Sequence, residues 1–177
     1  MANGKIYMMS PGKADQLNSW SACLILVAVA VFCFVMEPEE WLASVLVGVI
    51  GIVTAAYTFA MSPQCIIVDG EGVGIRKRMG GKFLPLREIK SVEWYDKGGK
   101  TLRMDKTTIR VAGNGGMFGY TGRWRNKDIG SFTIYARRLT GLVLIEMADG
   151  MKIVVSCDEP QAMVDDLTSR IGLTSKL

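Results

Sequence analysis

The chain contains no histidine among its 177 residues, so it lacks the side chain most often used for acid–base catalysis. Histidine-based triads and zinc sites of the His-Glu-x-x-His type are therefore excluded. Carboxylates and lysines are present, but their spacing matches no catalytic motif. We predict a protein that is not an enzyme, and catalysis on a lipid or a peptide is the least favoured function.

The four cysteines form no recognisable metal or redox motif. Cys23 and Cys33 lie in a long apolar run, whereas Cys65 and Cys157 lie far apart in the rest of the chain. No Cys-x-x-Cys pair occurs, so neither a zinc site nor a thioredoxin-like centre is indicated. We expect reduced, buried thiols and a protein that holds no metal and no cofactor.

The glycine-rich segment 113–130 is the most unusual stretch of the sequence. A Gly-x-Gly-x-x-Gly motif starting at Gly113 would need a glycine where Phe118 stands, and no Gly-Lys-Ser/Thr occurs, so nucleotide binding is not indicated. One interpretation is a structural connection whose aromatic rings pack on the domain. The other is an exposed interaction loop, since loops often carry binding residues. Its candidate residues are Phe118, Tyr120, Arg123, Trp124 and Arg125.

A second candidate site is a group of basic residues that follows shortly after the apolar part of the chain. A basic side chain near an anionic membrane surface contributes about 1 kcal/mol of attraction. Three interpretations are open, namely a solvated face, nonspecific contact with anionic lipid headgroups, and a specific headgroup pocket. Alternation along a strand would place Lys77 on the opposite face from its neighbours. The group consists of Arg76, Lys77, Arg78, Lys82 and Arg87.

The charge balance favours a membrane surface over nucleic acid as a partner. Residues after Met61 include 19 basic and 13 acidic side chains, a net charge of +6 in a chain whose total is +4. This modest excess is typical of a domain beside an anionic leaflet. The basic residues are not gathered into one dense run, so we expect no nucleic-acid partner.

Two apolar runs must position these candidate residues. Residues 20–36 and 41–61 contain no charged side chain. As helices they would span about 26 and 32 Å, close to the bilayer core of about 30 Å. The first run is longer than a usual signal core and ends without a small-x-small cleavage site. We predict a transmembrane helical hairpin over residues 20–61, with its turn at Glu37-Pro38-Glu39-Glu40.

The flanking charges predict the orientation of this hairpin. Lysines and arginines precede the first run and follow the second, whereas the turn carries only glutamates. The positive-inside rule then places both termini in the cytoplasm of a multi-pass protein of the cytoplasmic (inner) membrane. We expect the cytoplasmic N-terminal arm, residues 1–19, to be loosely ordered. Gly48 and Gly51 would permit close helix packing within the hairpin or between copies.

Residues 62–177 show the pattern of a cytoplasmic all-β domain closed by one helix. About seven short stretches with strand-like alternation are separated by turn signals such as Ala148-Asp149-Gly150. The last segment has a helix start at Asp158-Glu159-Pro160 and then carries Met163 and Leu167 at helical spacing. We predict a barrel of about seven antiparallel strands with a C-terminal capping α-helix.

Three stretches of this domain resemble the bacterial PH domain family. They are Ile66–Arg76, Leu86–Glu93 and Gly116–Trp124, the last continuing to Ala136. The resemblance covers roughly residues 64–172 and implies a PH-like barrel. Eukaryotic PH domains often bind phosphoinositides through basic loop residues, but no matching motif occurs here, so the resemblance implies no particular site residues.

These features predict a non-enzymatic, membrane-anchored PH-like interaction module at the cytoplasmic face of a bacterial membrane. Its partner would be another protein or a second copy of the chain. The alternative is a domain that senses anionic lipids, or makes peripheral contact with the membrane, through its basic residues.

Overall fold

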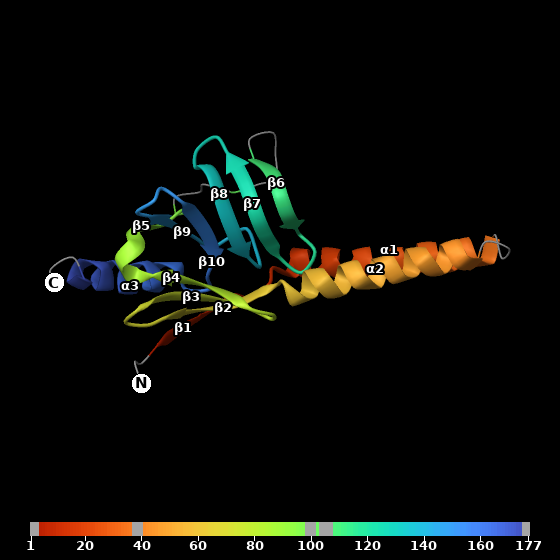
Figure 1. Ribbon diagram of the computed structural model, residues 1–177, viewed down its shortest axis with the longest axis horizontal. Helices are drawn as coiled ribbons and strands as arrows, with labels where there is room; N and C mark the ends of the chain where they lie inside the picture. The colour runs from red at the N-terminus through yellow and green to blue at the C-terminus, as the bar shows by residue number, and fades with distance from the viewer. Residues whose placement is uncertain (1–3, 37–40, 98–101, 103–107, 175–177) are drawn as a thin grey trace.

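Two long helices project from one end of a β-sheet domain in the computed structural model of the chain (Figure 1). The structure describes residues 4–36, 41–97, 102 and 108–174. Helix α1 comprises Lys13–Met36, and helix α2 comprises Trp41–Ala60. The predicted turn at residues 37–40 lies outside the described residues.

Both helices are long and apolar enough to cross a membrane. Most of their large apolar side chains are exposed, Leu24 to 70%, and such a surface is stable in lipid rather than in water. The predicted pair of apolar helices is therefore confirmed, and it suggests membrane association. Helix α1 begins at Lys13, before the uncharged run, and its first turns carry Asp15 and Ser19, which bond to the domain.

The short arm before α1 contributes a strand to the domain. Strand β1, Lys5–Met8, pairs antiparallel with β2, Pro63–Val68, which follows α2. Tyr7 is 2% exposed, and its hydroxyl donates to the Asp166 carboxylate at 3.0 Å. The expectation of a loosely ordered arm is wrong for these residues, because Tyr7 and Met9 are part of the core. The hairpin is thus inserted between two paired strands.

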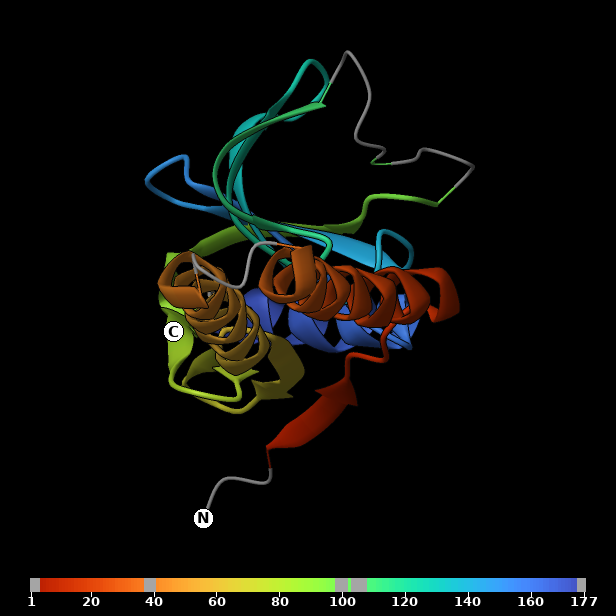
Figure 2. The ribbon, with the colours of Figure 1, turned by 90° about the vertical axis from the view of Figure 1, so that its right-hand side faces the viewer.

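The strands form two sheets. One has the order β1-β2-β3-β4 and the other β5-β9-β10-β8-β7-β6, in which β10 and β8 are parallel and the other neighbours antiparallel. Viewed along the hairpin, the two sheets lie on opposite sides of the helix bases (Figure 2). The remaining elements are β3 (Gly72–Lys77), β4 (Gly81–Pro85), the 3-10 helix η2 (Leu86–Glu88), β5 (Ile89–Trp94), β6 (Thr108–Gly115), β7 (Tyr120–Asn126), β8 (Gly130–Ala136), β9 (Leu142–Met147), β10 (Lys152–Ser156) and α3 (Pro160–Thr174).

The prediction of a closed barrel of about seven antiparallel strands is wrong, since the described residues form ten strands in two sheets with one parallel pair. The sequence did not indicate two of these strands. Strand β1 lies before the hairpin, and β7 lies in the glycine-rich segment. Gly113 and Gly122 face each other across β6 and β7, and a Cβ on either would overlap a carbonyl oxygen of the opposite strand. These glycines allow close strand approach and do not mark a long loop.

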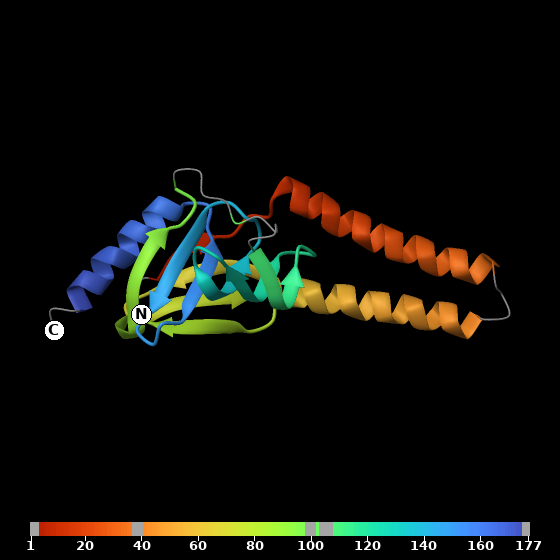
Figure 3. The ribbon, with the colours of Figure 1, turned by 90° about the horizontal axis from the view of Figure 1, so that it is seen from above.

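Apolar clusters cover both faces of the central strands of the six-stranded sheet. In β10, Ile153 and Val155 belong to the cluster shared with the four-stranded sheet and α3, whereas Val154 belongs to the other, with Trp124 and Phe132. This alternation is that of a strand buried on both faces. The predicted C-terminal helix is confirmed. Helix α3 packs on β5 and η2, at the end of the domain away from the hairpin (Figure 3).

The pairing of β1 with the rest of the domain predicts that Tyr7 stabilises the fold. Tyr7→Ala should lower the free energy of unfolding by about 3 kcal/mol, because it removes a buried ring. Tyr7→Phe should cost about 1 kcal/mol through the lost hydrogen bond. Thermal unfolding of the full chain in detergent measures both. The exposed neighbour Ile6 is the control, and an Ile6→Ala effect as large as that of Tyr7→Ala would contradict an ordered β1.

Candidate functional site

The turn between β6 and β7 reaches the bases of both long helices (Figure 1). The ring of Phe118, in this turn, makes edge-to-face contacts with Trp20 of α1 at 6.1 Å and with Phe59 of α2 at 5.3 Å between centroids. Its φ of 58° is the only positive value among the described non-glycine residues. A bulky residue in this region is strained and is held there by its surroundings.

Two serines hold the backbone of Phe118. Its N–H donates to Ser19 Oγ at 2.9 Å, and its carbonyl accepts from the Ser62 hydroxyl at 2.7 Å. Both serines are 2% exposed. Ser19 lies in α1 and Ser62 lies two residues after the end of α2, so one residue of the domain is bonded to both sides of the hairpin. We refer to Ser19, Phe118 and Ser62 as the serine clamp.

The other aromatic rings of the glycine-rich segment face the interior. Tyr120 is 7% and Trp124 is 1% exposed, and their rings meet edge-to-face at 6.0 Å. The Tyr120 hydroxyl donates to Asp15 Oδ1 at 2.6 Å. Burial, followed by the hydrogen bond and the negative charge of Asp15, raises the pKa of Tyr120, so the phenol stays neutral and able to donate. Arg123 and Arg125 are exposed, so these residues do not form one surface with the buried rings.

The basic candidate residues divide between the two ends of the β3–β4 hairpin. Arg78 places its guanidinium over the Phe59 ring, 4.0 Å from the centroid. The backbone N–H of Arg78 donates to the Ser62 carbonyl at 3.1 Å. Lys77 lies over the Tyr135 ring at 5.5 Å. Arg76 and Lys82 lie near the same end, whereas Arg87 lies at the other end, in η2. The structure therefore brings Arg78 and Phe118 together through Phe59, and it separates Arg87 from them.

A pocket of about 210 Å³ lies at this junction of hairpin and domain. Its walls carry the aromatic rings of Trp20, Phe59 and Phe118, two arginines, Arg78 and Arg137, and one acidic residue, Asp15. We call it the junction pocket. It joins members of both groups of candidate residues, and its chemistry, two guanidinium groups beside aromatic rings, suits the binding of an anion.

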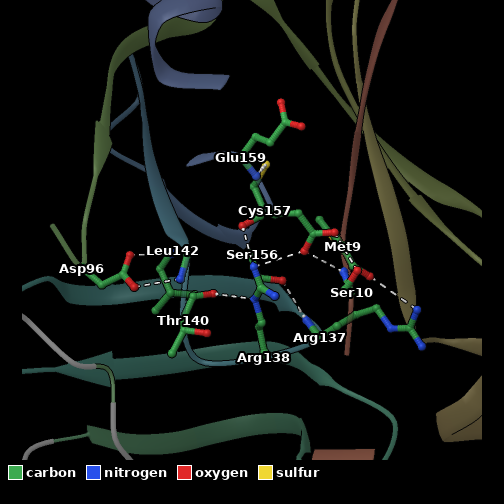
Figure 4. A network of polar contacts seen from close by, with 12 residues as sticks. Met9, Ser10, Asp96, Arg137, Arg138, Thr140, Leu142, Ser156, Cys157 and Glu159 are labelled. Atoms are coloured by element: carbon green, nitrogen blue, oxygen red, sulfur yellow. Dashed lines mark hydrogen bonds and ion pairs between the residues drawn. The ribbon is translucent and has the colours of Figure 1, made fainter. Parts of the chain in front are cut away.

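Arg137 is a pocket residue that sequence reasoning missed. It follows β8 and extends toward Met9, whose carbonyl accepts from Nη1 at 3.4 Å (Figure 4). Its Nε is fully buried and has no hydrogen-bond partner within the described part of the chain. Burial, followed by the positive charge of Arg78, lowers the pKa of Arg137, while Asp158 acts in the opposite direction. No sequence pattern links Arg137 with Arg78, because the fold alone brings them together.

Two further acidic residues, Asp158 and Asp96, are already bonded to groups outside the junction pocket. Asp158 forms an ion pair with Arg138 at 3.1 Å and accepts from the Ser10 hydroxyl at 2.6 Å and the Ser10 N–H at 3.1 Å. Asp96 accepts from the N–H groups of Gly141 and Leu142, both at 2.7 Å, and so fixes the turn before β9 (Figure 4). Within the described residues, no three His, Cys, Asp or Glu side chains gather as a metal site would require.

A comparison with family models matches residues 64–171, more than half of the chain, to the model described as Bacterial PH domain. The comparison with curated proteins gave no match. The comparison with solved structures gave none either.

The serine clamp predicts a local effect of Ser62→Ala. The substitution leaves the Phe118 carbonyl without its donor, which costs about 1–3 kcal/mol for a buried group. Hydrogen–deuterium exchange of amides 113–119 should therefore become faster, while exchange in β8 stays unchanged. Ser21→Ala is the matched control, because Ser21 is exposed and its hydroxyl bonds only within α1, to Asn18. Equal exchange in Ser62→Ala and in the unmodified chain would contradict the clamp.

Proposed function

The chain belongs to the bacterial PH domain family, and on that basis we propose that it is a membrane-anchored interaction module without catalytic activity. PH domains are in general interaction modules rather than enzymes. The serine clamp supports the proposal, because it fixes the domain on the hairpin in one orientation. A domain held in this way offers the same surfaces to every partner at the membrane.

We place the hairpin across the bacterial cytoplasmic membrane, with both termini in the cytoplasm. The pairing of β1 with β2 supports this topology, because strands on either side of the hairpin can pair only if both lie on the same side of the membrane. Lys5 and Lys13 before the hairpin, and the basic residues after it, favour the cytoplasmic side.

The free edge of β6 is the surface that best suits a protein partner, and it carries this proposal. Among the described strands, β6 is one of the two edge strands of its sheet, with β7 as its neighbour. Ile109 is 62% and Val111 is 65% exposed, and Arg125 stands opposite Ile109 in the register. An exposed strand edge with apolar side chains pairs readily with another strand, and arginine is enriched in protein interfaces. The partner is another protein or a second copy of the chain.

Contact with anionic lipid headgroups is the second candidate function. The turn that joins β3 to β4 is bonded to the end of α2, with the Met79 N–H donating to the Ala60 carbonyl at 3.0 Å. Arg76, Arg78 and Lys82 therefore stand close to the point where the apolar helix ends, which is headgroup level in the proposed topology.

Substitution at the β6 edge tests the interaction module. Ile109→Lys combined with Val111→Lys should remove most of the complex captured by crosslinking in cells and kept through detergent extraction. A central apolar contact contributes about 2 kcal/mol or more, roughly a thirtyfold change in affinity. Ile6→Lys, on the outermost strand of the other sheet, is the control. A chain that stays monomeric and captures no protein, or a complex that survives the double substitution, would contradict the proposal.

A further inference from the structure

An apolar groove between the two long helices lies one helical turn beyond the junction pocket. The groove has a volume of about 280 Å³ and is lined by side chains from residues 23–31 of α1 and 47–55 of α2. On α1, Ser19 of the junction pocket is followed at helical spacing by Cys23 and Leu26 of the groove. On α2, Phe59 is followed in the same way by Ala55 and other residues of the groove. One path therefore leads from a polar end at the domain to an apolar end inside the hairpin.

The shape of the hairpin favours a long, thin occupant. The helices are farther apart beside the domain than at their far ends (Figure 3). Deeper in the hairpin, small residues keep the groove narrow, because a Cβ on Gly48 would lie 3.9 Å from the Ala30 Cβ, and one on Gly51 would lie 3.8 Å from Leu26. A groove of about 280 Å³ between such closely packed helices is too small for a helix, about 10 Å across, and suits only a slender apolar chain.

The polar end of the path has an excess of positive charge. Arg78 and Arg137 both line it, and its one carboxylate, Asp15, already accepts from the Tyr120 hydroxyl. The nearby Asp158 is bonded to Arg138 and Ser10. The buried Nε of Arg137 has no hydrogen-bond partner among the residues that the structure describes, which is costly for a charged donor.

We propose that this path binds one anionic phospholipid, with an acyl chain in the groove between α1 and α2 and its phosphate between Arg78 and Arg137. Guanidinium groups bind phosphate oxygens in pairs, so two arginines at one point are well suited to a phosphodiester. The aromatic rings of Trp20 and Phe59 lie at the same level, where interfacial aromatic residues are enriched. A free phosphate ion would use only the polar end and would leave the groove unexplained.

This inference rests on the proposed membrane insertion of the hairpin, and lipid binding by the full chain tests it. The purified chain in detergent is mixed with phosphatidylglycerol, or with phosphatidylcholine of the same acyl chains, and bound lipid is counted by native mass spectrometry. We expect one phosphatidylglycerol to bind about tenfold more tightly than phosphatidylcholine. Inorganic phosphate and glycerol phosphate should not displace it. Equal binding of the two lipids, or displacement by inorganic phosphate, would overturn the lipid site.

Substitutions locate the site. Arg137→Gln and Arg78→Gln should each weaken phosphatidylglycerol binding about tenfold, since each removes charged hydrogen bonds. Arg137→Lys keeps the charge and should retain part of the binding if Arg137→Gln fails to fold. Gly51→Leu should fill the groove and reduce binding of both lipids. Arg110→Gln is the matched control, because Arg110 is exposed on β6 and does not line the junction pocket. An equal loss in Arg110→Gln would indicate only general attraction and would overturn the site.

Membrane insertion is scored separately by resistance of the unmodified chain to alkaline carbonate extraction. Release of the unmodified chain would contradict the proposed anchoring and, with it, the lipid site. If the unmodified chain resists carbonate extraction but binds phosphatidylglycerol and phosphatidylcholine equally, the lipid site alone is overturned.

Discussion

The bonding of Phe118 to both sides of the helical hairpin is the constraint on which the rest of the structure depends. Ser19 and Ser62 each hold a different backbone group of this residue, and Trp20 and Phe59 contact its ring. A phenylalanine at positive φ persists only where several contacts determine its position together. These contacts bond the domain to the bases of both helices, so we expect it to keep one orientation on the hairpin.

The insertion of the hairpin between β1 and β2 gives the same orientation a second support. Because these strands pair, the start of α1 and the end of α2 are held by a single sheet. The turn after β8 then brings Arg137 to the place where Arg78 stands over Phe59. The junction pocket is thus made by five separate parts of the chain, at residues 11–20, 59, 78, 118–119 and 137, which meet only in the fold. A change in the spacing of the helix bases must therefore change the pocket too.

The features that the sequence could predict were those with a strong local signal. Long uncharged runs predicted the two helices, and the spacing of Met163 and Leu167 predicted α3. Strand β7 was missed because the glycines in and around it, needed where Gly113 of β6 and Gly122 of β7 face each other, resemble a loop. For the candidate site, Phe118 and Arg78 were found from their types, but Arg137, Ser19 and Ser62 were not. Their roles depend on contacts between residues that are distant in the chain, and no local pattern carries that information.

The central claim, a domain fixed in one orientation on the hairpin, is tested most directly by a distance measurement between the two parts. Spin labels at Asn18 of α1 and Arg125 of β7, both exposed, can be introduced into a cysteine-free chain in lipid nanodiscs. Double electron–electron resonance should then give a single narrow distance distribution. A broad or multiple distribution in this labelled chain would show that the domain moves relative to the hairpin and would contradict the account.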